Sequence, residues 1–73
     1  MNHNDLKNLR EALIGELQAI NQYQQYVNET DNEKIKKVLS HIRDDEKEHF
    51  AELVKLIQEL DSTQKEKFQK EEL

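Results

Sequence analysis

The sequence predicts an all-α fold, an antiparallel hairpin of two long helices that dimerises into a four-helix bundle. Proline is absent and glycine occurs once, whereas turn-rich β architectures need more of both. Charged residues make up 37% of the chain and hydrophobic residues 34%, a balance that suits amphipathic helices with wide solvated faces. Two long stretches also carry apolar residues at alternating steps of three and four, the spacing of a packed helical seam.

The first helix is expected from Asp5 to Val27, with Asn4 as its N-cap. One face of this segment repeats at steps of three and four residues. That inward face consists of Leu6, Leu9, Leu13, Glu16, Ile20, Tyr23 and Val27. We therefore expect one stripe of the helix to pack against a partner helix.

The second helix is expected from Asp31 to Leu60, after a short connection in which Thr30 and Glu33 have the spacing of a capping box. Because the connection is short, the two helices should run antiparallel. The inward face of the second helix consists of Ile35, Leu39, Ile42, Glu46, His49, Leu53, Leu56 and Leu60. Flanking apolar residues widen the two faces and favour assembly of several copies; they are Ile14, Leu17, Val38, Phe50, Val54 and Ile57.

The helical pattern breaks after Leu60. Residues 1–60 are therefore expected to form the hairpin, and residues 61–73 a short helix or a flexible tail. Thr63 and Glu66 have the spacing to cap such a helix, whose apolar content is limited to Phe68 and Leu73.

Composition excludes several classes of function. The net charge is −5 and no basic stripe is present, so a nucleic-acid partner is not expected. No apolar run approaches the ~20 residues that span a bilayer, so no membrane partner is expected either. The first residues lack the features of a signal peptide, and a cytoplasmic location is expected. A chain of 73 residues without cysteine needs metal or oligomerisation to be stable.

Three ionisable residues occupy the middle of the predicted seam. When the hairpin is folded about residue 31, Glu16 falls opposite Glu46, and His49 lies one turn further along the second helix. Desolvating two facing carboxylates costs several kcal/mol unless something compensates. A divalent cation does so, because carboxylate and imidazole ligands together suit iron, manganese or zinc. One lone Glu and one Glu-x-x-His form half of a di-iron site, which two copies related by a two-fold axis would complete.

Simpler readings of these residues stay open at this point. A Glu-x-x-His motif arises easily by chance in a chain with 16 acidic residues, and a buried Glu–His ion pair could fix the pairing of a metal-free helical dimer. Tyr23 is read as a core aromatic residue in preference to a redox participant. His3 and His41 lie off the seam and are read as surface residues.

The stretch from Glu16 to Tyr23, together with Asp45 to His49, resembles one half of a rubrerythrin or ferritin, and most of all the encapsulated ferritins. The resemblance covers about residues 5–60. It implies a ferritin-like four-helix bundle with Glu16, Glu46 and His49 as catalytic residues and metal ligands. It further implies a ferroxidase that binds two irons per dimer interface, assembles as a dimer or as a ring such as a decamer, and stores iron inside an encapsulin nanocompartment with the shell protein as partner.

Other aspects of the function have alternatives. Manganese, zinc or calcium can substitute for iron in such a site. Some family members carry further glutamates beside the first-helix ligand, where they form an entry site; this chain has Gly15 and Gln18 there. The alternatives to a ferroxidase are a rubrerythrin-like peroxidase, which would need another protein as electron donor, and a metal-free structural helical oligomer.

Overall fold

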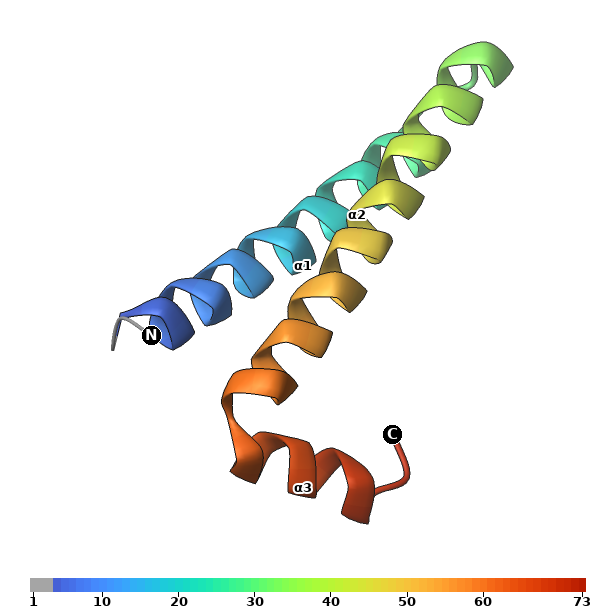
Figure 1. Ribbon diagram of the computed structural model, residues 1–73. Coiled ribbons are helices and arrows are strands. Elements are labelled where there is room, and N and C mark those ends of the chain that lie inside the picture. Colours follow the sequence, from blue (N-terminus) through green and yellow to red (C-terminus); the bar gives the residue numbers. More distant parts are fainter. Residues whose placement is uncertain (1–3) are drawn as a thin grey trace.

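A computed structural model describes residues 4–73, which form three helices and no strand (Figure 1). Helix α1 spans Asp5–Glu29, α2 spans Glu33–Leu60 and α3 spans Ser62–Lys70. The two long helices run antiparallel, and α3 turns sharply away from the end of α2 (Figure 1). The predicted all-helical hairpin is therefore confirmed. His3, which the sequence placed on the surface, lies outside the described residues.

Helix α1 begins one residue after Asn4, as predicted, but the Asn4 side chain makes no capping hydrogen bond. The helix continues two residues beyond the predicted end, to Glu29. It stops at Thr30, whose extended backbone (φ −93°, ψ 138°) still lets its N–H donate to the Tyr26 carbonyl.

The predicted capping box of Thr30 and Glu33 is wrong, because the N-cap of α2 is Asn32. Asn32 Oδ1 accepts a hydrogen bond from the Ile35 N–H at 3.0 Å. Thr30 already ends α1, and its hydroxyl accepts from the Asn32 N–H at 3.2 Å. Asparagine is among the strongest N-caps, so the polar turn satisfies both helix ends with few residues.

Helix α3 is capped by Asp61 and not by Thr63, the residue predicted from sequence. Asp61 Oδ1 accepts from the Gln64 N–H at 3.1 Å, and its Oδ2 pairs with Arg10 Nη2 of α1 at 2.8 Å. The Gln64 N–H, together with the Arg10 guanidinium, lowers the pKa of the Asp61 carboxyl. One side chain thus joins the ends of all three helices.

The predicted seam is partly or fully buried along the whole of α1 but only in the middle of α2. Ile35, Leu56 and Leu60 were expected to face inward, yet each is exposed by more than a third. His49, also expected to face inward, has a half-exposed side chain. Near the end of α2 the buried residue is Ile57, at 6% exposure. A strict seven-residue repeat drifts by ~20° per heptad around a straight helix, so the contact moves from Leu56 to Ile57.

The two long helices form one layer, with extents of 45 × 28 × 13 Å for the chain. Only Val27 and Ile57 are buried among the described residues. A compact monomer of 8.8 kDa would expose about 4,800 Å², whereas this chain exposes 5,760 Å². A second layer of helices is the usual way to cover such a face. None of the described helices combines the length and apolar character needed to cross a bilayer.

Candidate metal centre

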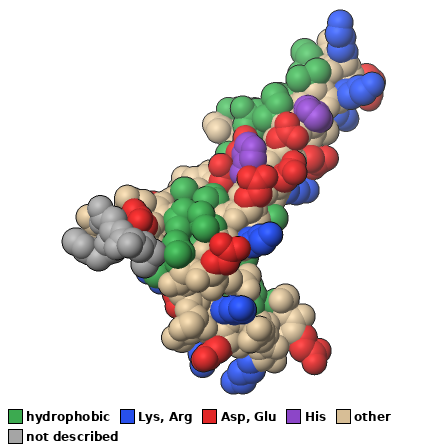
Figure 2. Space-filling model, viewed as in Figure 1, with side chains coloured by type: hydrophobic (Ala, Val, Ile, Leu, Met, Phe, Trp, Pro, Cys, Tyr) green, Lys and Arg blue, Asp and Glu red, His purple; other side chains and the backbone are tan. Residues whose placement is uncertain are grey.

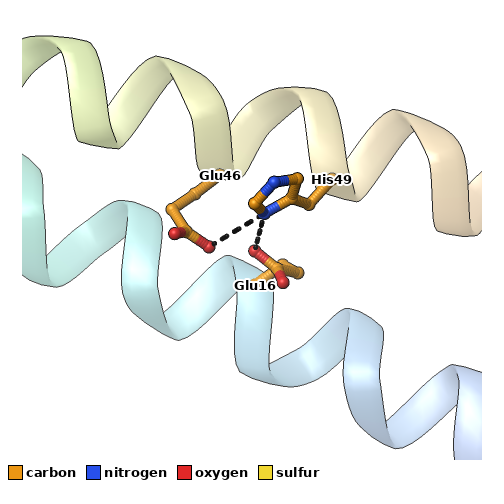
Figure 3. Close-up of side chains that lie close together, drawn as sticks. All are labelled: Glu16, Glu46 and His49. Carbon is orange, nitrogen blue, oxygen red and sulfur yellow. Dashed lines mark ion pairs between the residues drawn. The ribbon is translucent and has the colours of Figure 1, made fainter.

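Glu16, Glu46 and His49 converge between the two long helices (Figure 3). Glu16 comes from the middle of α1, and Glu46 and His49 lie one turn apart on α2. His49 Nδ1 is 3.5 Å from Glu16 Oε2 and 3.5 Å from Glu46 Oε2. One donor atom from each of the three side chains lies within 4.8 Å of the other two. The structure therefore brings together the three residues singled out from sequence.

The two carboxylates are mostly covered, whereas the imidazole is half exposed. The exposed fractions of the side chains are 23% for Glu16, 21% for Glu46 and 50% for His49. Glu16 Oε2 is itself buried and has no hydrogen-bond partner. At 3.5 Å the His49 nitrogen is too distant for a good hydrogen bond, so this oxygen keeps unused acceptor capacity.

The close approach of the three side chains shifts the pKa values of Glu16 and His49. The Glu46 carboxylate raises the pKa of the Glu16 carboxyl, because it would accept a hydrogen bond from Glu16 once Glu16 is protonated. Desolvation and the negative charge of Glu46 raise this pKa further. Desolvation works against protonation of His49, but attraction to Glu16 and Glu46 outweighs it and raises the pKa of His49. Without a metal, the cluster therefore binds protons more tightly than its separate groups would. A cation is the natural replacement for those protons.

The donor set suits a divalent transition metal, because two carboxylates and one imidazole offer hard oxygen ligands and a nitrogen. A satisfied, buried Glu–His ion pair would look different. In that case the imidazole would be enclosed and the carboxylate oxygens would be occupied. Here the imidazole is open on one side and one buried oxygen lacks a partner, which favours the metal over the ion pair.

The exposed side of the site lies among further charged groups. In the space-filling view, acidic and histidine side chains gather in a band, with hydrophobic side chains on either side of it along the molecule (Figure 2). Glu52, one turn beyond His49 on α2, also contributes to the raised pKa of His49. The sequence analysis did not single out Glu52, although its i,i+3 spacing from His49 places it on the same face.

Other polar and aromatic residues lie away from the cluster or play a packing role. His41 is exposed and pairs with Asp45 at 3.4 Å on the surface of α2. Tyr23 packs edge-to-face against Tyr26, with ring centroids 5.8 Å apart. Arg43 donates to Gln24 across the helices at 3.0 Å, an interhelical bond that the sequence analysis did not anticipate.

The profile of the EncFtn-like family matches residues 1–72, which is nearly the whole chain. The chain belongs to the EncFtn-like family. The resemblance to encapsulated ferritins is therefore confirmed, and the cluster lies in a protein of ferritin-like descent.

Three relatives of this EncFtn-like chain carry informative names. It is 35% identical over 66 residues to the encapsulin nanocompartment cargo protein EncB of Myxococcus xanthus, covering 90% of this chain and 42% of EncB. It is 41% identical over 58 residues to EncC, a cargo protein of the same organism, covering 80% of this chain and 45% of EncC. It is 39% identical over 56 residues to a ferritin-like-encapsulin shell fusion protein of Pyrococcus furiosus, covering 77% of this chain and 16% of the fusion.

The chain thus spans less than half of the length of each of these relatives. No solved structure matches it.

Proposed function

We propose that this chain oxidises Fe(II) to Fe(III) at a di-iron site shared between two copies. The observation that carries the proposal is the convergence of Glu16, Glu46 and His49 around a buried carboxylate oxygen without a partner. An orphaned buried acceptor is costly, at ~1–3 kcal/mol, and a bound cation would remove that cost.

Two copies are required because one hairpin supplies only half of the ligands. A di-iron bundle uses one Glu from each of two helices and a Glu-x-x-His from each of the other two. Two copies related by a two-fold axis would supply four glutamates and two histidines. The half-exposed His49 and the single layer of helices leave an open side on which the second copy can pack.

Iron is the substrate of the proposed reaction. Hard carboxylate oxygens stabilise Fe(III) relative to Fe(II) and therefore favour loss of an electron. Two Fe(II) ions held together would pass two electrons to one oxidant, reducing dioxygen to peroxide, or peroxide to water with uptake of two protons. The ordered carboxylates of Glu16 and Glu46 would hold the pair, and the open side at His49 would admit the oxidant.

We further propose that the product is stored inside an encapsulin compartment. Two relatives are named as encapsulin nanocompartment cargo, and a third joins a ferritin-like segment to the shell protein in one chain. The shell protein would then be the macromolecular partner of the homo-oligomer. Co-expression with an encapsulin shell, followed by shell purification, tests this association.

The experiment that tests the activity compares Glu46→Gln with Glu48→Gln. Both changes remove one negative charge from α2, but only Glu46 belongs to the cluster, and Glu48 is exposed. Glu46→Gln should lower the initial rate of Fe(II) oxidation at least tenfold and abolish tight Fe(II) binding, whereas Glu48→Gln should match the wild type. Glu16→Ala and His49→Ala should behave like Glu46→Gln, with His41→Ala as the histidine control. Equal rates for Glu46→Gln and Glu48→Gln would rule out the site.

A further inference from the structure

A groove of about 490 Å³ lies between α2 and α3, away from the metal-binding cluster. Phe50, Ala51 and Val54 of α2 form its apolar wall. Helix α3 leaves α2 at a sharp angle (Figure 1), and only Asp61 lies between the two helices. An apolar group would fit against this wall.

The rim of this groove carries a net positive charge. Lys55 and Lys65 line it from α2 and α3, together with the acidic Glu59. Within the part of the chain that the structure describes, neither lysine forms an ion pair, although other surface lysines do. An occupant with negative charge beside its apolar group would fit this rim.

The far end of α3 presents such a group. Leu73 is 83% exposed, the highest value among the exposed large hydrophobic residues described. It follows Glu71 and Glu72, which form no ion pair with any described residue. This end is also held in a defined conformation: Glu72 and Leu73 donate to the Gln69 and Phe68 carbonyls at 3.1 and 2.9 Å, the two bonds of a Schellman motif.

The backbone conformation of Glu72 also belongs to the Schellman motif. Its φ of 58° lies in the left-handed region, which glycine usually occupies at this position of the motif. In Schellman motifs the residue at the position of Leu73 frequently packs against the one at the position of Phe68. Here Phe68 faces a different groove, with Leu13 and Ile57, and Leu73 stays in solvent. The chain thus holds an apolar side chain outward at a fixed place.

We infer that the groove of one copy receives the Glu71–Leu73 end of a second copy. Leu73 would lie against Phe50 and Val54, and Glu71 and Glu72 would approach Lys55 and Lys65. Under a two-fold axis each copy gives one end and receives one, so the contact closes on itself. None of the three cluster residues takes part, and this contact would therefore add to the metal-linked interface without depending on it.

Single-cysteine variants test this contact, because the natural chain contains no cysteine. Ala51→Cys and Leu73→Cys proteins are mixed in equal amounts and oxidised mildly, with Fe(II) and separately with chelator. The mixed disulfide should form at least tenfold faster than in a control mixture of Leu73→Cys with Lys37→Cys, an exposed position near the other end of the hairpin. If the test mixture and the Lys37→Cys control mixture formed mixed disulfide at the same rate, both with Fe(II) and with chelator, the inference would be overturned.

A charge exchange in the same mixture supplies the second readout. Glu71→Lys with Glu72→Lys, placed in the Leu73→Cys protein, should slow formation of the mixed disulfide at low ionic strength. Lys55→Glu with Lys65→Glu, placed in the Ala51→Cys protein, should restore it. Restoration separates a specific contact from a change of fold. If the mixture that carries both charge reversals does not form the mixed disulfide at the original rate, the assigned charge pairing is wrong and the inference fails.

Fe(II) oxidation at the wild-type rate in Glu46→Gln protein would refute the proposed function, and it would leave the cross-linking result unchanged. The two proposals can therefore fail separately.

Discussion

At the scale of single residues, the proposed metal site makes protons and metal compete for the same cluster. Glu16 and His49 both have raised pKa values in the folded chain, above ordinary values of 4.5 and 6.5. The Glu46 carboxylate and partial desolvation raise the pKa of Glu16. Partial desolvation opposes protonation of His49, but attraction to the two carboxylates outweighs it and raises the pKa of His49. A group whose folded pKa is raised stabilises the fold below its unfolded pKa, and this contribution is lost as the pH rises through the folded pKa.

We therefore predict that the metal-free protein loses stability as the pH rises above about 4.5, with a second loss above about 6.5. Asp61 acts in the opposite sense, since its lowered pKa gives stability that is lost as the pH falls below its ordinary value of 3.8. With metal bound, stability should instead increase with pH near neutral pH, because deprotonated ligands bind metal more tightly.

The melting temperature measured from pH 4 to pH 8, with chelator and with Mn(II) as a probe that dioxygen does not readily oxidise, checks this prediction. The stabilisation by Mn(II) should grow with pH in wild type and in His41→Ala protein, and should be absent from His49→Ala protein. A metal-free melting temperature that rises steadily from pH 6 to pH 8 in wild type, but not in His49→Ala, would contradict the assigned sign.

At the scale of the helices, Gly15 is the residue that the isolated chain does not explain. A Cβ atom built at Gly15 meets nothing within 4 Å, although glycine costs α1 about 1 kcal/mol relative to alanine. It precedes Glu16 directly, so a close approach by a second copy at the shared site would account for it.

Gly15→Ala should thus have opposite effects on the separate chain and on the assembly. With chelator at low concentration, the free energy of unfolding should rise by about 1 kcal/mol. With metal, the assembly should dissociate at higher protein concentration than in wild type. Asn21→Ala, another exposed position in α1, should raise helix stability without weakening assembly. Strengthening of both states by Gly15→Ala would show that no second copy packs at this position.

Asp61 is the residue on which the arrangement of the helices depends most directly. Its two carboxylate oxygens serve different elements, one as the cap of α3 and one as the partner of Arg10. Asp61→Ala should cost about 1 kcal/mol for the lost cap, plus up to about 1 kcal/mol for the lost ion pair. Asp61→Asn should keep most of the cap and lose only the ionic part.

Amide hydrogen exchange distinguishes these two variants. Asp61→Ala should speed exchange throughout α3, at Gln64 to Phe68, and leave the middle of α2 unchanged. Arg10→Gln, which removes the same ion pair from the other side, should resemble Asp61→Asn. If Asp61→Ala and Asp61→Asn exchange alike, the cap is not what holds α3 in place.

At the scale of the whole molecule, the hairpin lacks a core large enough to stand alone. It has one layer of long helices, and exposed apolar side chains such as Ile14, Leu17 and Val38 remain on its surface. A second layer of helices would cover these side chains, and further copies would supply it in the proposed assembly. In the proposed assembly, four carboxylates would meet across the interface without metal, and their repulsion would oppose association.

Fe(II) should therefore drive association near neutral pH, and chelator or mild acid should reverse it. The measurement is oligomer mass by sedimentation or native mass spectrometry against added Fe(II), at pH 5.5 and pH 7.5. A metal-free structural oligomer predicts the reverse for acid, because protonating the facing glutamates relieves their repulsion. A compact, stable monomer at micromolar concentration under all conditions would end the shared-site proposal.

The sequence alone determined the fold class, the two long helices and the residues of the cluster. These features depend on periodicity along one helix, and a face that repeats every three or four residues can be read without knowing what it faces. The all-helical hairpin and the family resemblance are confirmed, whereas assembly into a four-helix bundle stays a prediction. The ligand roles of Glu16, Glu46 and His49 stay predictions, although the structure brings their side chains together.

The tertiary structure decided what depends on contacts between helices. Periodicity could not show that Ile57 replaces Leu56 at the end of the seam. The helix face drifts slightly relative to a seven-residue repeat, and Leu56 and Ile57 are adjacent residues of similar size and hydrophobicity. Nor could it choose Asn32 and Asp61 as caps over Thr30 and Thr63, because several polar residues in each turn have the right chemistry. The bond from Asp61 to Arg10, 51 positions away, exists only because the hairpin brings the two helix ends together. A local pattern cannot specify such a contact, which links the cap of α3 to α1.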